Sequence, residues 1–410
     1  MLHKLAKRFF AYSGKLYTWG SDPHYSRSTN LPKTSKDIPS EFQGFSAGEI
    51  SKVAFGINHG AIITNDGLVY TFGKGNYGAL GHDSEDAQDK PTLIESLKNI
   101  EIKVKDVAVG QHHTVLLTTE GDIWTMGYGG QLAGGIWRKM FSQGGGALGH
   151  GDLNDKFVPT PIEALKEHDD ITQIAAGSYH SLALGSNGIL TIWGKGEHGV
   201  LGLGTNRNHL SPVINRFFDE IKNEEKVKIK KIAACHYYTA VLLDDGRVFT
   251  WGRNDEGQLA IGSSLGLDMY ECQRHPTEVE STLEGKKVID VETGENIIVF
   301  KTEDQEVYVA GRKLWWEPMK LNTPPDAKIT SIFAGDNFAG YINDERDVYF
   351  VGKIFSSKYV EEIKDLRIWK VKNEVFKGKL IEKIGGSYQT AHYCFLKDED
   401  TKPNDKPAQQ

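Results

Sequence analysis

The sequence has few cysteines and no long apolar run. Its three cysteines, Cys235, Cys272 and Cys394, lie far apart, and none belongs to a CxxC pair or a Cys/His cluster. A disulfide framework and a structural zinc site are therefore not indicated. Three free thiols in a reducing compartment are expected instead. No apolar run approaches the ~20 residues that a transmembrane helix needs, so no transmembrane span is predicted.

An excess of positive charge is also missing. Lys and Arg number 48 against 55 Asp and Glu, which gives a net charge of −7. Proteins that bind duplex nucleic acids usually present a basic surface. A nucleic-acid partner, chromatin included, is therefore not expected.

Motifs of enzymes and cofactor sites are absent as well. The sequence contains no GxSxG, no HExxH and no dinucleotide fingerprint. The glycine-rich stretches at Gly129-Gly130 and at residues 144–146 are not followed by the Lys-Ser/Thr of a phosphate-binding loop. We predict no catalytic residues, no cofactor, no metal and no small-molecule substrate.

Glycine and aromatic residues are abundant instead, and they recur in register. A strand-like run ending in a residue–glycine pair occurs seven times, with spacings of 53, 54, 67, 58, 59 and 41 residues. The pairs are Trp19-Gly20, Phe72-Gly73, Met126-Gly127, Trp193-Gly194, Trp251-Gly252, Ala310-Gly311 and Val351-Gly352. Recurrence at periods of about 40–60 residues is typical of repeat architectures.

Two further positions are repeated at constant offsets from these pairs. Six residues before the terminal glycine, five units have Gly, and dipeptides such as Asp66-Gly67 favour a tight hairpin turn. Seventeen residues before it stand Gly56, Gly110, Gly177, Cys235, Gly294 and Gly335. Random scatter of glycine does not produce identical offsets, so the units are true repeats.

Each unit is predicted to contain short strands separated by these turns. In the second unit the strands are expected at residues 104–109, 114–118 and 123–126, where β-branched and aromatic residues alternate in part. The last unit, 379–397, lacks a strand, and Lys15 to Gly20 at the N-terminus has no strands before it. Pairing the two ends would complete a seventh unit. The predicted fold is an all-β, seven-bladed β-propeller closed by the N-terminal strand.

Four segments carry a resemblance to a known family. They are VAFGINHGAIITNDGLVYTFGKGNYGALGH, VAVGQHHTVLLTTEGDIWTMG, IAAGSYHSLALGSNGILTIWGKGEHGVLGLG and IAACHYYTAVLLDDGRVFTWGRNDEGQLAIG. They resemble the repeat of the regulator of chromosome condensation family, strongly from about Val53 to Gly262 and weakly afterwards. The resemblance implies a seven-bladed propeller whose members act as scaffolds or as exchange factors for small GTPases.

Histidines recur three residues after the unit glycine, at His59, His113 and His180. Equivalent residues of a wide ring lie too far apart to share an ion, because metal–nitrogen bonds are ~2 Å long. We therefore expect a structural role, in which each partly buried imidazole bonds to backbone in its own or the next blade.

The two ends of the chain differ from the repeats. Residues 1–13 contain Lys4, Lys7 and Arg8, no acid, and an apolar stripe at helical spacing, which is typical of a mitochondrial targeting segment. A short helix docked on the fold is the alternative. The propeller is assigned to 14–397, and the polar run 398–410 is predicted to be a disordered tail. The predicted location is the mitochondrial matrix or the matrix face of the inner membrane.

One loop is much longer than its counterparts. Gly127 to Gly146 spans nineteen residues, against five between equivalent glycines in three other units, and the insertion at about 129–144 holds an apolar cluster. Exposed apolar clusters mark contact sites, although this loop could instead fold back onto its own propeller. A second candidate patch, in the divergent fifth unit, could equally be replacement core. The predicted partner-binding residues are Ile136, Trp137, Arg138, Met140, Phe141, Trp315 and Trp316.

These features predict a non-catalytic protein–protein interaction scaffold. The expected partners are subunits of a large mitochondrial complex, since mitochondrial members of the family are associated with respiratory-chain and mitoribosome assembly. The chain would be a structural subunit or an assembly factor of that complex. The alternative is a guanine-nucleotide exchange factor for a small GTPase, with the insertion as a wedge.

Overall fold

The structure is a computed structural model of the 410-residue chain. It describes residues 15–19, 40–42, 45–130, 145–166, 170–262, 272–324, 326–352, 360–363, 368–372, 375–376, 380–387 and 391–397. The predicted targeting segment 1–13, the predicted tail 398–410 and residues 131–144 of the insertion lie outside the described residues.

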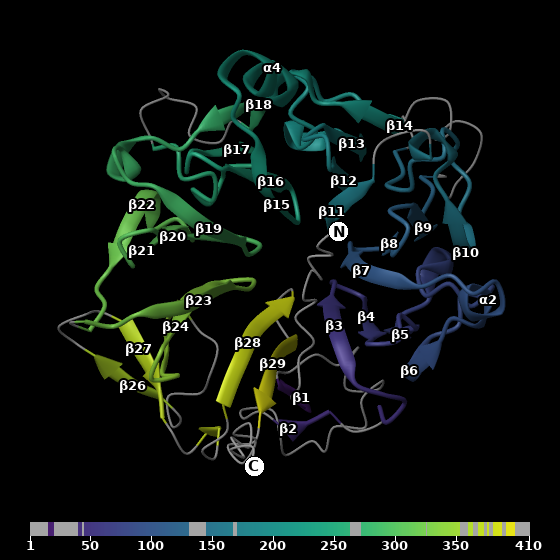
Figure 1. The fold of residues 1–410 in the computed structure, drawn as a ribbon, viewed down its shortest axis with the longest axis horizontal. Helices are drawn as coiled ribbons and strands as arrows, with labels where there is room; N and C mark the ends of the chain where they lie inside the picture. The colour runs from purple at the N-terminus through teal and green to yellow at the C-terminus, as the bar shows by residue number, and fades with distance from the viewer. Residues whose placement is uncertain are drawn as a thin grey trace, which may run out of the picture.

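The described strands form seven antiparallel sheets, six of four strands and one of five, arranged around a common centre (Figure 1). The fold is all-β and propeller-like, as the sequence predicts. The inner strands are β3 (Ile50–Phe55), β7 (Val104–Val109), β11 (Ile171–Ala176), β15 (Ile229–Cys235), β19 (Val288–Thr293), β23 (Ile329–Ala334) and β28 (Leu380–Ser387). The second strands are β4 (His59–Thr64), β8 (His113–Thr118), β12 (His180–Gly185), β16 (Tyr238–Leu243), β20 (Ile297–Thr302), β24 (Phe338–Asn343) and β29 (Ala391–Lys397).

The third strands carry the residue–glycine pairs. They are β5 (Val69–Gly73), β9 (Ile123–Gly127), β13 (Leu190–Gly194), β17 (Val248–Gly252), β21 (Val307–Gly311), β25 (Val348–Gly352) and β1 (Lys15–Trp19). The outer strands are β6 (Gln88–Leu93), β10 (Lys156–Pro161), β14 (His209–Ile214), β18 (Gln273–Glu278), β22 (Trp315–Leu321), β2 (Ser40–Glu41) and, in the five-stranded sheet, β27 (Ile368–Val371) followed by β26 (Val360–Ile363).

The second strands of the sheets are more deeply buried than the outer strands. Every residue of β4, β8, β12, β16 and β24 is buried, because each sheet packs against a neighbouring sheet on both faces. The residues of the outer strands are mostly half-buried or exposed, and five of these strands contain proline at their fourth position. Proline lacks the amide proton of a central ladder and is confined to sheet edges, so these positions fix which strand lies outside.

The N-terminal strand lies in the same sheet as the C-terminal strands. Strand β1 pairs antiparallel with β29, placing Tyr17 opposite Cys394 and Thr18 opposite Tyr393, and it also pairs with β2. Leu16 is buried in the core against Phe42 and Phe72. On the other face of β1, Tyr17 packs against the core cluster that includes Ile381 and Ile384 of β28, so residues from both ends of the chain share a core.

Two features differ from the simple repeat. The sheet that begins with β23 has a fifth strand, because a hairpin of β26 and β27 stands where one outer strand would. Short helices also occur in the connections. Between sheets lie α2 (Glu95–Asn99), α4 (Arg216–Glu225) and the 3-10 turns η2 (Glu163–Leu165) and η4 (Ser281–Leu283), whereas η1 (Asn76–Gly78) and η3 (Glu197–Gly199) lie between the third and fourth strands of one sheet. In α4, Phe218 is buried edge-on against Phe249, with ring centroids 5.7 Å apart, which anchors the helix.

The pairing of β1 with β29 can be tested with one new thiol. Tyr17→Cys places a cysteine opposite the natural Cys394, and paired residues in antiparallel strands have Cβ atoms about 4.5–5.5 Å apart, near the separation that a disulfide needs. Mild oxidation should join positions 17 and 394, as read by mass spectrometry of non-reduced peptides. The double variant Tyr17→Cys/Cys394→Ser is the control. A thiol at 17 that stays reduced would contradict the pairing.

Candidate partner-binding face

Because the strands of each sheet are antiparallel, every second connection along a sheet lies on the same side of the molecule. The connections from first to second strand and from third to fourth strand share this side. We call it the loop face. It is defined by the first-to-second connections 56–58, 110–112, 177–179, 236–237, 294–296 and 335–337.

Neighbouring sheets approach most closely at the glycines that begin these connections. A Cβ on Gly110 would lie 2.6 Å from the carbonyl oxygen of Gly177, and a Cβ on Gly294 would overlap the carbonyl oxygen of Gly335. Such separations are closer than atoms tolerate, so only glycine fits. Inter-sheet packing thus requires glycine at Gly110 and Gly294, whereas Cys235 occupies the equivalent position in the sheet that begins with β15.

Backbone hydrogen bonds join the same loops from one sheet to the next. The Gln111 amide donates to the Ser178 carbonyl at 3.2 Å, and the Ser178 amide donates to the His236 carbonyl at 2.8 Å. The Glu295 amide donates to the Gly335 carbonyl at 3.2 Å. These bonds hold the first residue of each loop in a fixed position on the loop face.

The three repeated histidines have the structural role that the sequence predicts, with a different partner. Each imidazole is fully buried and contacts a hydroxyl of the next sheet rather than backbone. The distances are 2.7 Å from His59 Nε2 to Thr114 Oγ1, 3.0 Å from His113 Nε2 to Ser181 Oγ, and 3.1 Å from His180 Nε2 to Thr239 Oγ1. Each hydroxyl in turn donates to a loop carbonyl. The imidazoles therefore connect neighbouring sheets.

Half-buried rings form an aromatic belt across the loop face of the four sheets that begin with β3, β7, β11 and β15. Its centre is Tyr128, whose ring centroid lies 4.9 Å from Tyr77 and 6.0 Å from Tyr179. The Lys195 ammonium stands 5.5 Å from the Tyr179 ring, a cation–π distance. The belt consists of Tyr77, His112, Tyr128, Tyr179, His198 and Tyr237.

The belt carries no net charge at neutral pH. Burial, with Tyr237 and Tyr128 nearby, raises the pKa of Tyr179 to about 12, and burial raises the pKa of Tyr128. Burial and the Lys74 charge lower the pKa of His112. The belt thus offers apolar ring faces with hydroxyl and imidazole groups at their edges, the composition typical of protein interfaces.

The long insertion starts and ends beside this belt. Gly129 and Gly130 follow Tyr128 directly, and a Cβ on Gly146 would overlap the Gly129 carbonyl. The Gly129 amide donates to Asp155 Oδ1 at 2.7 Å. The insertion therefore has a narrow stem. The predicted partner-binding residues Ile136, Trp137, Arg138, Met140 and Phe141 lie outside the described residues.

The other two predicted residues, Trp315 and Trp316, lie on the outer strand β22. Trp315 is half-buried against the core cluster of its own and the following sheet, with the Arg312 guanidinium 6.0 Å from its ring. Trp316 is half-buried against Gly257, in the loop of the preceding sheet. These rings contribute to inter-sheet packing, and the structure does not bring them near the aromatic belt.

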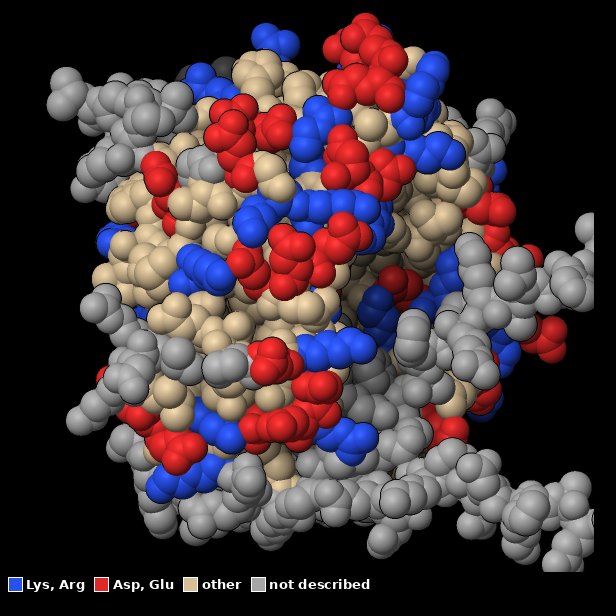
Figure 2. Space-filling view, turned by 60° about the vertical axis from the view of Figure 1, so that its left-hand side comes forward, with Lys and Arg blue, Asp and Glu red and all other residues tan. Residues whose placement is uncertain are grey.

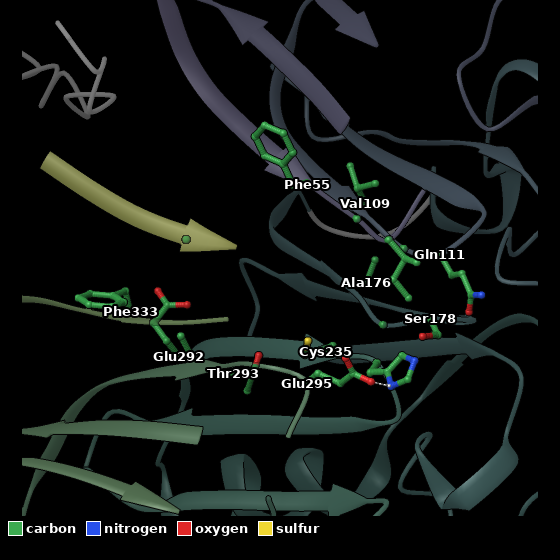
Figure 3. A pocket seen from close by; sticks show the side chains of 18 of the residues that line it. Phe55, Val109, Gln111, Ala176, Ser178, Cys235, Glu292, Thr293, Glu295 and Phe333 are labelled. Atoms are coloured by element: carbon green, nitrogen blue, oxygen red, sulfur yellow. Dashed lines mark ion pairs between the residues drawn. The ribbon is translucent and has the colours of Figure 1, made fainter. Parts of the chain in front are cut away.

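A cavity of about 200 Å³ lies at the centre of the loop face, where the inner strands end (Figure 3). In five units the residue after the repeat position contributes to its wall, namely Ile57, Gln111, Ser178, His236 and Glu295. Cys235 stands where other units have glycine, and its sulfur faces this space. Sequence reasoning missed the cavity, although the constant offset from the repeat glycine marks the positions that line it.

Charge on the flank of the molecule is mixed. On the side shown in Figure 2, basic and acidic side chains are interspersed. Ion pairs of the described residues include Lys231–Asp290 at 2.7 Å and Lys320–Glu306 at 2.5 Å. Within the described ranges, no group of three or more His, Cys, Asp or Glu is arranged to hold a metal ion. No helix in the described part of the chain is both long and apolar enough to cross a membrane.

Comparison with known proteins gives consistent matches. Residues 8–314 match the RCC1-like domain. The chain is 33% identical over 252 residues to the ultraviolet-B receptor UVR8 of Arabidopsis thaliana, covering 62% of this chain and 52% of UVR8. It is 27% identical over 298 residues to the RCC1 domain-containing protein RUG3, mitochondrial, of the same plant, covering 73% of this chain and 61% of RUG3. The chain therefore spans about half to three-fifths of these relatives.

Solved structures share the fold at low sequence identity. Prp20p of Saccharomyces cerevisiae, described with its binding properties to Gsp1p and histones, superposes with a TM-score of 0.75 at 18% identity, covering 94% of this chain and 92% of that one. Human WBSCR16 gives 0.69 at 17% identity, covering 94% and 100%. Both likenesses concern the fold.

The buried histidines predict acid sensitivity. Burial lowers the pKa of His113 to about 3, so between pH 6.5 and about 3 the unfolded chain binds a proton that the folded chain does not. Stability is therefore lost as the pH falls through this range, by about 2 kcal/mol per histidine at pH 5. In His113→Gln, the loss in free energy of unfolding between pH 7.5 and pH 5 should shrink by about this amount, as measured by urea denaturation.

Ser181→Ala is the matched control for this prediction. It removes the hydrogen-bond partner but keeps the imidazole, so it should lower stability at both pH values and retain the acid sensitivity. An unchanged pH dependence in His113→Gln would contradict the linkage.

Proposed function

The chain belongs to the RCC1-like domain family, and we propose that it is a non-catalytic scaffold that binds a protein partner through its loop face. The observation that supports this most is the aromatic belt beside the stem of the insertion. Half-buried tyrosines next to a loop rich in Trp, Met and Phe supply the large, rigid contact area that interfaces use. Function in such folds is carried by loops on a constant frame.

The insertion is proposed as the main anchor. Trp137, Met140 and Phe141 stand within six residues of one another, and each could contribute about 1.5–3 kcal/mol of gross transfer free energy when buried against a partner. The cost of ordering the loop reduces the net gain. The neighbouring Tyr128 and Tyr77 would extend the contact onto the belt. Trp315 and Trp316 are given a secondary role because their rings already pack between sheets.

We further propose that the seven sheets are seven blades of a closed ring spanning residues 14–397. The pairing of β1 with β29 supports this reading. Closure would pair two strand edges that would otherwise be open to other chains. A closed ring would also hold the loops of the first and last blades at fixed positions relative to each other.

The proposed location is the mitochondrion, and the proposed partner is a subunit of a large mitochondrial complex. Support comes from the basic, acid-free residues 1–13 and from the similarity to RUG3, a protein named as mitochondrial. The chain would act there as a structural subunit or an assembly factor, at the matrix or the matrix face of the inner membrane.

Guanine-nucleotide exchange on a small GTPase is the second candidate function. It is supported by the fold shared with Prp20p, whose binding to Gsp1p is described with its structure. The narrow stem of the insertion would let the loop act as a wedge. The two candidates differ in what they bind, so one capture experiment can separate them.

The capture experiment compares three forms of the chain tagged at the C-terminus and expressed in mitochondria of the source organism. They are the natural chain, a deletion of 131–144 that joins Gly130 to Gly145, and Ile100→Ser. The stem geometry allows the deletion, since Gly130 already lies against Gly146. Ile100 is 55% exposed and lies in a connection from an outer strand to the next inner strand, on the side away from the loop face.

The natural chain and Ile100→Ser should retain the same complex subunits in quantitative mass spectrometry. The deletion should retain at least tenfold less, as expected when anchor residues of an interface are lost. Equal recovery by all three forms would contradict the proposed role of the insertion. Recovery of a GTPase, together with faster nucleotide release that the deletion abolishes, would favour the second candidate.

A further inference from the structure

The central cavity is built by every sheet of the fold. Residues from all seven inner strands line it, from Phe55 on β3 to Ile384 on β28 (Figure 3). Its volume of about 200 Å³ corresponds to roughly seven water molecules at ~30 Å³ each. Because loop residues such as Gln111 and Ser178 form part of its wall, the cavity lies directly beneath the loop face.

Among its described residues, the wall carries two carboxylates and one imidazole, that of His236. Glu292 and Glu295 line the cavity, and no Lys or Arg does. Lys231, from outside the lining, lies 3.0 Å from Glu292 and offsets its charge. Glu295 has no such cation: its Oε1 lies 3.0 Å from His236 Nδ1 (the dashed line in Figure 3), and its Oε2 accepts no hydrogen bond.

The charge of Glu295 is costly in this position. Its side chain is 11% exposed, and it shares a hydrogen bond with Asp336, which is itself 6% exposed. Burial raises the pKa of Glu295, and burial lowers the pKa of His236 to about 4, so the imidazole is neutral at pH 7. The nearby Arg253 is ion-paired with Asp255. Two adjacent buried carboxyl groups favour the entry of a cation.

A second acceptor lies on the loop that follows β11, two sheets before the loop of Glu295. Ser178 is 2% exposed and lines the cavity, and its Oγ has no hydrogen-bond partner. Buried hydroxyls are normally satisfied. The Oγ is shielded from water in the present rotamer, so it would gain a partner by turning into the cavity. The backbone of Ser178 is held from both sides by inter-sheet hydrogen bonds, which fixes the position of the hydroxyl.

The rest of the wall is apolar and in part aromatic. Phe55 and Phe333 flank the cavity in Figure 3, together with Val109 and Ala176. A guanidinium is less strongly hydrated than an ammonium, stacks on aromatic faces and presents several donors in one plane. It therefore fits a space with aromatic walls and two separated acceptors better than an ammonium does.

We propose that this cavity is a binding site for an arginine side chain of a partner protein, inserted from the loop face, with its guanidinium donating to Glu295 Oε2 and Ser178 Oγ. The aromatic belt would hold the surrounding partner surface while the arginine occupies the centre. The proposed function is needed only to say that a partner protein carries the arginine. The site itself can be tested without that protein.

The test measures binding of the peptide acetyl-Gly-Arg-Gly-amide to the full chain by isothermal titration calorimetry. A peptide with citrulline in place of arginine keeps the shape but lacks the charge, and it should bind to the natural chain at least tenfold more weakly. The arginine peptide should likewise bind at least tenfold more weakly to Glu295→Gln than to the natural chain. Ser178→Ala should weaken binding by a few-fold, through loss of one acceptor. Glu303→Gln, a 63% exposed carboxylate on the same sheet as Glu292, should bind like the natural chain.

Each other outcome would overturn the proposal. No binding at millimolar peptide would mean that the cavity holds only water, and equal binding of the citrulline peptide would exclude charge recognition. Equal binding of a lysine peptide would overturn the assignment to a guanidinium. If Glu295→Gln does not fold, as judged by circular dichroism, the Ser178→Ala variant and the citrulline peptide still decide. A negative result here leaves the capture of a partner by the loop face unaffected, so the two failures can be told apart.

Discussion

The structure depends on the close approach of neighbouring sheets at the ends of their inner strands. At Gly110 and Gly294 the backbone of one sheet touches that of the next so closely that no Cβ fits. The adjoining amides and carbonyls bond from loop to loop, and the buried histidines join hydroxyls of the next sheet a few residues further on. Backbone contacts and these buried hydrogen bonds therefore fix each sheet relative to its neighbour. Surface ion pairs contribute less, because their net stabilisation is small.

This constraint explains why one face can carry the function. Loops that start at the packed glycines have little freedom in their first residues, so Ser178, His236 and Glu295 meet around one cavity although the first and last are 117 residues apart in sequence. The residues just beyond them, such as Tyr179 and Tyr237, are then presented as half-buried rings. A rigid frame lowers the entropy cost of binding. Variation is concentrated in the loops that follow the third strands, the longest of which is the insertion between Gly130 and Gly145.

Much of this fold could be predicted from the sequence, because the repeat is carried by residues that the backbone requires. Glycine at constant offsets predicted β7, β8 and β9 to within a residue, whereas the fourth strand of that sheet, β10, was not predicted. The prolines of β6, β14 and β18 mark the outer edge. Where these requirements weaken, prediction fails. The hairpin β26–β27 follows Gly352, where the loop glycines of the other units are missing, and α4 lies in a connection with no repeated anchor.

The candidate site was predictable only in part, for a physical reason. An insertion is visible in one unit of sequence, whereas the cavity and the aromatic belt arise from residues of different units that meet only after the sheets pack. Trp315 and Trp316 are the converse case: a conspicuous pair in the sequence whose rings pack in part between sheets, and whose role in partner binding stays a prediction.

The central claim, that a partner binds the loop face, is tested most directly by lysine cross-linking of the captured complex followed by mass spectrometry. Lys74 and Lys195 lie on the loop face, next to Asn58 and Tyr179, whereas Lys98 and Lys222 lie on the helices between sheets. The account predicts cross-links from partner subunits to Lys74 and Lys195. Cross-links concentrated at Lys98 and Lys222 would contradict it.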